Sequence, residues 1–223
     1  MGWLSEALGT SIGKKFIMAV TGIGLILFLI IHLIGNLTLY GGPEAFNGYV
    51  ETLDIVKPII RVIEVVLALV FILHIFNGVK LWFENKKAKS TDNKISARRE
   101  NTTFSARTTI LTGSIVFIFL VLHLATFWYA FNFTGQPHEY ASGYYQIVVE
   151  WFQFPWYSVI YIIAVIMLGI HLNHGFQSAF QTFGWNHNKY FRFIQKFGTA
   201  YAVVIALGFA SLPIYFLFFY GGN

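Results

Sequence analysis

Residues 16–39 read FIMAVTGIGLILFLIIHLIGNLTL, and this stretch decides the fold class. It contains no Asp, Glu, Lys or Arg. An α-helix of about 20 residues is long enough to cross the roughly 30 Å hydrocarbon core of a bilayer. The stretch therefore predicts a membrane-spanning helix.

Four further apolar stretches have similar length and character, namely residues 59–83, 109–131, 156–182 and 199–220. Charged residues make up only 11% of the chain, against about 25% in ordinary soluble domains. Strands with open edges are excluded from lipid because their backbone groups would find no partner there. We predict an all-α membrane protein in which five transmembrane helices form a bundle, a single membrane domain covering residues 1–223.

Lysine and arginine are gathered at one end of the five predicted helices. Thirteen of the fifteen lie there: Lys14, Lys15, Lys80, Lys86, Lys87, Lys89, Lys94, Arg98, Arg99, Arg107, Lys189, Arg192 and Lys196. Lys57 and Arg61 lie at the other end. By the positive-inside rule, the N-terminus is expected in the cytoplasm and the C-terminus outside. Topology and lipid headgroups account for the net charge of +5, so no nucleic-acid partner is expected.

The absence of cysteine narrows the redox chemistry that the chain can support. Disulfides, iron–sulfur clusters, thiolate zinc sites and covalently attached c-type haem all require cysteine. No predicted loop is longer than about 25 residues, which leaves no room for a soluble catalytic domain. We also find no convincing internal repeat.

Four histidines fall within four different predicted spans: His32, His74, His123 and His171. His32 and His123 lie seven and eight residues before the outer ends of the first and third spans. His74 and His171 lie nine and eleven residues before the inner ends of the second and fourth spans. Because a helix rises about 1.5 Å per residue, the four side chains form two level pairs at different depths.

Two level pairs of histidines suit two bis-histidine haems stacked across the membrane, because haem iron accepts one axial imidazole on each side. A zinc site is less favoured, since each level has only two clear ligands. His74 and His171 are each followed by glycine four residues later, at Gly78 and Gly175. Such a glycine leaves room for a porphyrin edge, although helix packing can also require it. His174 lies one turn from His171 and is the alternative ligand, a propionate or quinone partner, or simply an interfacial residue.

At this point the sequence resembles the di-haem cytochrome b (b558-type) membrane anchor of succinate dehydrogenase and fumarate reductase, the succinate:quinone oxidoreductases. Locally the resemblance rests on GKKF at 13–16, HLIGN at 32–36 and HLNHGFQS at 171–178. It covers nearly the whole chain. It implies that His32 and His123 ligate a distal haem b, and that His74 and His171 ligate a proximal one. The family's helix 4 ligand matches His171 rather than His174.

The resemblance also implies partners and a location. An iron–sulfur subunit carrying a flavoprotein subunit would dock on the cytoplasmic face of a bacterial cytoplasmic membrane. Electrons would pass through the two haems to or from a quinone, expected to be menaquinone. A di-haem cytochrome b of another membrane oxidoreductase, or a transporter without haem, remains an alternative.

Three charged residues lie at the ends of the second span. Glu64 is about level with His32, and Arg61 lies one turn further out. They are expected either to pair with each other or to exchange protons at an outer quinone site, because a carboxylate in lipid must be paired or functional. Lys80, at the inner end, is a candidate partner for a haem propionate, and snorkelling to the interface explains it equally well.

Overall fold

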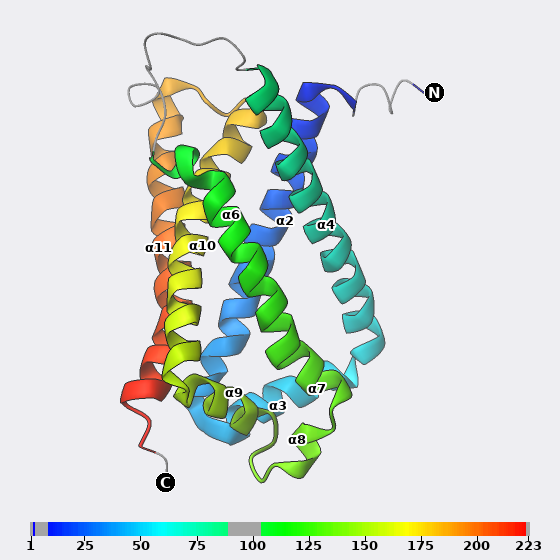
Figure 1. Ribbon diagram of the computed structural model, residues 1–223, viewed down its shortest axis with the longest axis vertical. Helices are drawn as coiled ribbons and strands as arrows, with labels where there is room; N and C mark the ends of the chain where they lie inside the picture. Colours follow the sequence, from blue (N-terminus) through cyan, green and yellow to red (C-terminus); the bar gives the residue numbers. More distant parts are fainter. Residues whose placement is uncertain (1, 3–8, 89–103, 222–223) are drawn as a thin grey trace.

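The structure is a computed structural model that describes residues 2, 9–88 and 104–221. The described residues form helices and connecting turns without a strand, and five of the helices are long and apolar enough to cross a membrane (Figure 1). The predicted all-α membrane bundle is confirmed. Some of the basic residues that we expected at one end of the bundle lie outside the described residues, namely Lys89, Lys94, Arg98 and Arg99. The side chain of Arg107 is also outside the described part.

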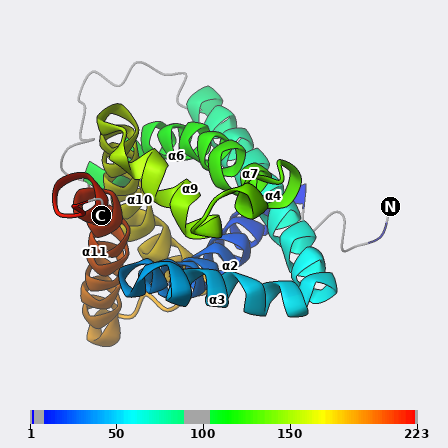
Figure 2. The same cartoon turned by 90° about the horizontal axis from the view of Figure 1, so that it is seen from below.

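The first span, α2 (Ser11–Leu37), starts where Thr10 caps it, because the Thr10 hydroxyl accepts a 3.0 Å hydrogen bond from the Gly13 N–H. A short 3₁₀ helix, η1 (Thr38–Gly41), ends the span. Gly42 then turns the chain with a φ of 80°, a conformation that favours glycine. The chain continues as α3 (Gly42–Ile55), which lies across the end of the bundle where we expected only a loop (Figure 2).

The second and third spans run past the ends that the sequence predicts. The second, α4 (Lys57–Ala88), extends beyond the expected 59–83 at both ends. The third is continuous but changes helix type: α6 (Phe104–His123) passes into a π-helix, η2 (Leu124–Trp128), and then into α7 (Tyr129–Phe133).

Two short helices follow, α8 (Gln136–Glu139) and α9 (Gly143–Gln153), again where a loop was expected. The fourth span, α10 (Pro155–Thr182), agrees with its predicted limits within one residue. The fifth, α11 (Asn188–Phe218), begins eleven residues before the predicted start. Residues 188–198 are therefore the first turns of a helix rather than a loop.

Helix α10 is the central helix, since it packs against α11, α6 and α2, whereas α4 lies at the edge of the bundle and packs mainly on α2. The most deeply buried side chains gather where α9, α10 and α11 meet, next to α3. They include Leu39, Ile147, Phe152, Leu212 and Phe216. The amphipathic helices α3 and α9 close this end, which we call the C-terminal end (Figure 2).

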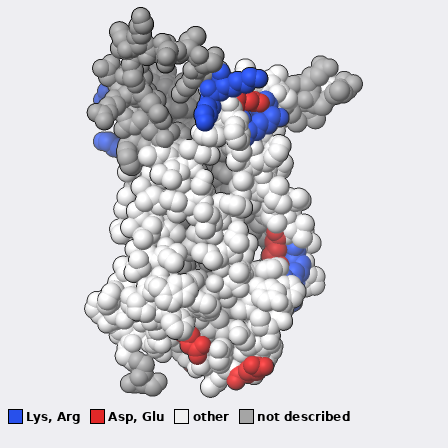
Figure 3. Space-filling view, in the orientation of Figure 1, with Lys and Arg blue, Asp and Glu red and all other residues white. Residues whose placement is uncertain are grey.

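We call the opposite end of the bundle the N-terminal end. There an ion pair links α2 to α4, with Lys14 Nζ 2.5 Å from Glu84 Oε1. On the face shown in Figure 3, charged side chains gather near the two ends and leave a broad belt with few charged side chains between them. One adjoining acidic and basic patch interrupts the lower part of the belt. This distribution suits a bundle surrounded by lipid.

Candidate functional site

His32 on α2 and His123 on α6 face one another near the C-terminal half of the bundle. Their ring centroids are 5.7 Å apart and their planes are 89° apart. Aromatic rings surround them: Phe28 stacks on His32 at 5.2 Å, Phe209 lies 5.6 Å from His32, and Phe127 lies 5.4 Å from His123. We call His32 and His123 the outer pair. Apolar aromatic side chains surround their rings and limit the access of water.

His74 on α4 and His171 on α10 form a second facing pair, with ring centroids 6.2 Å apart and planes at 76°. Their surroundings differ from those of the outer pair. Nδ1 of His74 lies 3.2 Å from the hydroxyl of Thr21 on α2, and Nδ1 of His171 lies 3.4 Å from the hydroxyl of Thr112 on α6. Both threonines are buried.

Helix geometry gives the spacing between the two levels. Thr21, which touches the inner pair, precedes His32 of the outer pair by eleven residues on the same helix. Eleven residues are close to three helical turns, so both side chains lie on one face and about 16 Å apart along α2. Thr112 and His123 repeat this relationship on α6.

The ring separations fit a metal ion held between two imidazoles. A metal–imidazole bond is about 2 Å long, so two such bonds on opposite sides of one iron place the nitrogens about 4 Å apart and the ring centres somewhat further. The centroid distances of 5.7 and 6.2 Å agree with this arrangement. A haem iron held between two imidazoles would fit this spacing.

The side chains available as metal ligands also favour haem over zinc. In the part of the chain that the structure describes, no three His, Cys, Asp or Glu side chains cluster at a possible metal site. Protein zinc sites need three or four such ligands, whereas a bis-histidine haem needs two. Nδ1 of His123 is buried without a hydrogen-bond partner among the described residues. The histidine pairs therefore fit two haem groups.

The remaining residues expected near the inner pair occupy different environments. A methyl group on Gly175 would meet nothing within 4 Å, whereas one on Gly78 would lie 3.0 Å from the end of the Met18 side chain. His174 is partly buried, one turn past His171 towards the N-terminal end. Lys80 is exposed, and no ion pair is formed by it within the described residues.

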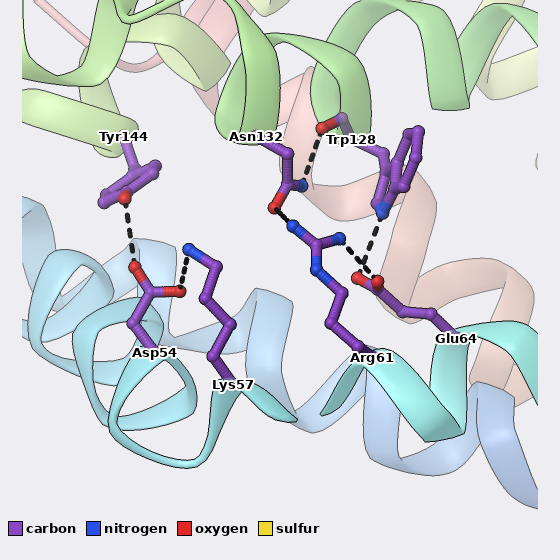
Figure 4. Close-up of polar contacts among 7 residues, drawn as sticks. All are labelled: Asp54, Lys57, Arg61, Glu64, Trp128, Asn132 and Tyr144. Atoms are coloured by element: carbon purple, nitrogen blue, oxygen red, sulfur yellow. Dashed lines mark hydrogen bonds and ion pairs between the residues drawn. The ribbon is translucent and has the colours of Figure 1, made fainter. Parts of the chain in front are cut away.

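Glu64 and Arg61 belong to a polar cluster between α4 and the third span (Figure 4). Arg61 Nη1 lies 2.6 Å from Glu64 Oε2, so the two residues do pair. The indole N–H of Trp128 donates to Glu64 Oε1 at 3.0 Å, and Arg61 Nη2 donates to Asn132 Oδ1 at 2.7 Å. The Glu64 side chain nevertheless keeps 29% of its surface exposed. Sequence reasoning missed Trp128 and Asn132 as members of this cluster.

The π-helix explains how Trp128 and Asn132 come to face α4. The Tyr129 N–H bonds to the Leu124 carbonyl five residues earlier, directly after His123. One extra residue in a turn rotates everything beyond it by about 100° relative to a continuous α-helix. Such π-bulges are frequent at functional sites.

A second ionic contact lies beside this cluster, at the α3–α4 junction. Lys57 Nζ is 3.0 Å from Asp54 Oδ1, and the Tyr144 hydroxyl donates to Asp54 Oδ2 at 3.4 Å (Figure 4). Partial burial, and then the Asp54 carboxylate, raise the pKa of Tyr144. Tyr144 therefore remains a hydrogen-bond donor at neutral pH and ties α9 to α3.

A comparison with family models matches the chain over residues 16–106 and 85–209 to one described as succinate dehydrogenase/fumarate reductase transmembrane subunit. The chain belongs to this family. No curated protein and no solved structure matches it. Membership of the family agrees with a multi-pass membrane subunit that works with catalytic partner subunits.

The two matched segments of the succinate dehydrogenase/fumarate reductase family overlap only at 85–106. The first contains most of α2 and all of α4, and the second contains α6 and α10. Each segment thus contributes one histidine to the outer pair and one to the inner pair. The two segments also share one short sequence pattern. Thr-Gly, nine residues and then His occur at 21–32 and again at 112–123.

Proposed function

We propose that the chain is the membrane anchor and electron-transfer subunit of a succinate:quinone oxidoreductase and holds two b haems between its histidine pairs. One observation carries the proposal: four spanning helices bring four histidines together as two facing pairs, with ring centroids 5.7 and 6.2 Å apart. When bound, the haems supply one-electron transfer between the two ends of the bundle.

The chain's own residues account for binding and orientation. His32 and His123 would hold the outer, distal group, and the aromatic side chains around them exclude water. His74 and His171 would hold the inner, proximal group. A pair of neutral imidazoles is the usual protein donor set for such an iron.

The N-terminal end is the side on which we place the partner subunits. Lys14, Lys15, Lys86 and Lys87 lie at this end of α2 and α4, and α11 adds further basic residues. The positive-inside rule assigns such an end to the cytoplasm of a bacterial cell. An iron–sulfur subunit, carrying a flavoprotein subunit that acts on succinate or fumarate, docks there in this proposal.

A quinone, expected to be menaquinone, reacts at the opposite end, beside the Arg61–Glu64 pair. Reduction of a quinone takes up protons, so a titratable carboxylate close to the reacting oxygens is useful. Glu64 is partly exposed while Arg61 and Trp128 orient its two oxygens. In this role Glu64 exchanges the protons, and Arg61 and Trp128 position it.

The proposal is tested on the protein purified from membranes with whatever subunits accompany it. A reduced-minus-oxidised absorption spectrum should show b-type haem, and succinate should reduce it when a flavoprotein and an iron–sulfur subunit co-purify. Haem with other partner subunits would favour another oxidoreductase. A purified protein without haem absorbance would reject the electron-transfer role.

A further inference from the structure

Two threonine–glycine steps lie against the inner histidine pair, one from each half of the chain. Thr21 and Gly22 of α2 contact His74, and Thr112 and Gly113 of α6 contact His171. In each case the hydroxyl is near Nδ1, at 3.2 and 3.4 Å. The two contacts share residue type, position and target atom.

The direction of the Thr21 hydrogen bond follows from the other bonds of its hydroxyl. Thr21 Oγ1 donates to the Ile17 carbonyl at 2.8 Å, and it also lies 3.1 Å from the Met18 carbonyl. Since a hydroxyl has one proton, its lone pair is what faces His74. Nδ1 of His74 is therefore the donor, and Nε2 is left without a proton and able to bind a metal.

Thr112 makes the same kind of contact with His171, at a longer distance. Its hydroxyl donates to the Thr109 carbonyl at 3.1 Å, so it too presents a lone pair to the imidazole, that of His171. The Thr112 contact, at 3.4 Å, is also longer than the 3.2 Å contact between Thr21 and His74. His74 therefore depends more on its threonine than His171 does.

The glycines allow each imidazole to lie against the neighbouring helix. A Cβ at Gly22 would be 3.5 Å from Cε1 of His74, which is ordinary van der Waals contact. A Cβ at Gly113 would be 3.3 Å from Cε1 of His171, which is tight. The close approach brings the threonine before each glycine within reach of Nδ1.

The outer pair lacks this support. Nδ1 of His32 lies 3.5 Å from Asn36 Nδ2, an amide nitrogen that donates to the His32 carbonyl at 2.8 Å and cannot accept the Nδ1 proton. Nδ1 of His123 has no partner within the described part of the chain. The two levels therefore differ in the hydrogen bonds behind their imidazoles.

We propose that Thr21 and Thr112 are positioning residues that accept the Nδ1 protons of His74 and His171 and aim each Nε2 at the metal position between the rings. The inference rests on the proposed haem-binding function. Acceptors behind a ligating histidine fix its tautomer and raise its basicity, and losing one typically costs about 10- to 100-fold in metal affinity. A more basic imidazole favours ferric iron, so these threonines lower the potential of the inner haem.

The test compares Thr21→Val with Thr21→Ser and Ser114→Ala in the purified complex, using a redox titration and the electron paramagnetic resonance signals of both ferric haems. Valine keeps the shape of threonine but removes the acceptor, while serine keeps it. Ser114 is the matched control, because its hydroxyl donates to the Ile110 carbonyl on the exposed side of α6.

In Thr21→Val we expect one haem to titrate at a higher potential with an altered ferric signal, or to be lost on purification, while the other is unchanged. Thr21→Ser and Ser114→Ala should match the wild type. Unchanged midpoints in Thr21→Val, equal shifts or losses of both haems, or no rescue by serine would overturn the inference. A wild-type protein without haem would instead overturn the proposed function.

Discussion

The rings of His74 and His171 lie opposite one another with centroids 6.2 Å apart, although the two residues belong to different halves of the chain. His171 rather than His174 forms this contact, because one turn of α10 carries His174 towards the N-terminal end. The facing geometry, and not the number of histidines on a helix, therefore identifies the inner pair.

Replacing His171 should have a different result from replacing His174. We expect His171→Ala to lose one of two haems and His174→Ala to keep both, because the His174 ring is not the one that faces His74. Haem content of each purified variant measures this. One haem lost from His174→Ala but none from His171→Ala would reverse the assignment.

Gly175→Ala distinguishes two reasons for the glycine, space for a porphyrin edge and close packing of helices. The added methyl group meets no protein atom within 4 Å, and alanine favours a helix over glycine by about 1 kcal/mol, so the thermal stability of the apoprotein should not fall. If a porphyrin edge occupies this space, haem content should fall. Gly24→Ala is the control, since it also meets nothing and its site is exposed to lipid. Equal haem content in both variants would contradict the role given to Gly175.

Gly22 and Gly113 offer a graded test of the inner pair. A methyl group at Gly113 comes to 3.3 Å from the His171 ring, whereas one at Gly22 stays at 3.5 Å from the His74 ring. We expect Gly113→Ala to broaden or shift the ferric signal of one haem, and Gly22→Ala to change it less. The opposite order in electron paramagnetic resonance spectra would contradict the tighter approach of α6 to the His171 ring.

Glu64→Gln should remove proton exchange while keeping the side chain's shape. We expect quinone turnover to fall about 100-fold or more, because general acid–base groups contribute about that much, while both haem spectra remain. Glu44→Gln is the control, an exposed acid in the first turn of α3 at the same end. Trp128→Phe should cause a smaller loss, because it removes one donor to Glu64. Normal turnover in Glu64→Gln would exclude Glu64 from the reaction.

The spans were predictable from sequence because lipid imposes a simple requirement on length and hydropathy. Their ends were less so. Lys189, Arg192 and Lys196 made the start of α11 resemble a loop, but a helix can continue beyond the lipid with such residues in water. Helices α3 and α9 were missed since each has only one apolar face and lies across the bundle end.

The depth of the four histidines was predictable because rise per residue is constant in a helix. The rings that share a depth do lie beside one another in the structure, and their role as haem ligands stays a prediction. The threonines behind the inner pair could have been found from the repeated Thr-Gly and His spacing. The contacts of Trp128 with Glu64 and of Asn132 with Arg61 could not have been predicted, because they depend on a π-helix. Sequence periodicity does not reveal such a helix.

Haem stoichiometry in the wild type and in four single variants, His32→Ala, His74→Ala, His123→Ala and His171→Ala, tests the central claim most directly. His187→Ala, in the turn before α11, is the control. The account predicts two b haems per wild-type chain and one in each of the four variants. His32 and His123 variants should lose the same spectral component, and His74 and His171 variants the other. No haem in the wild type, or the same component lost from His32→Ala and His74→Ala, would contradict the two-level arrangement.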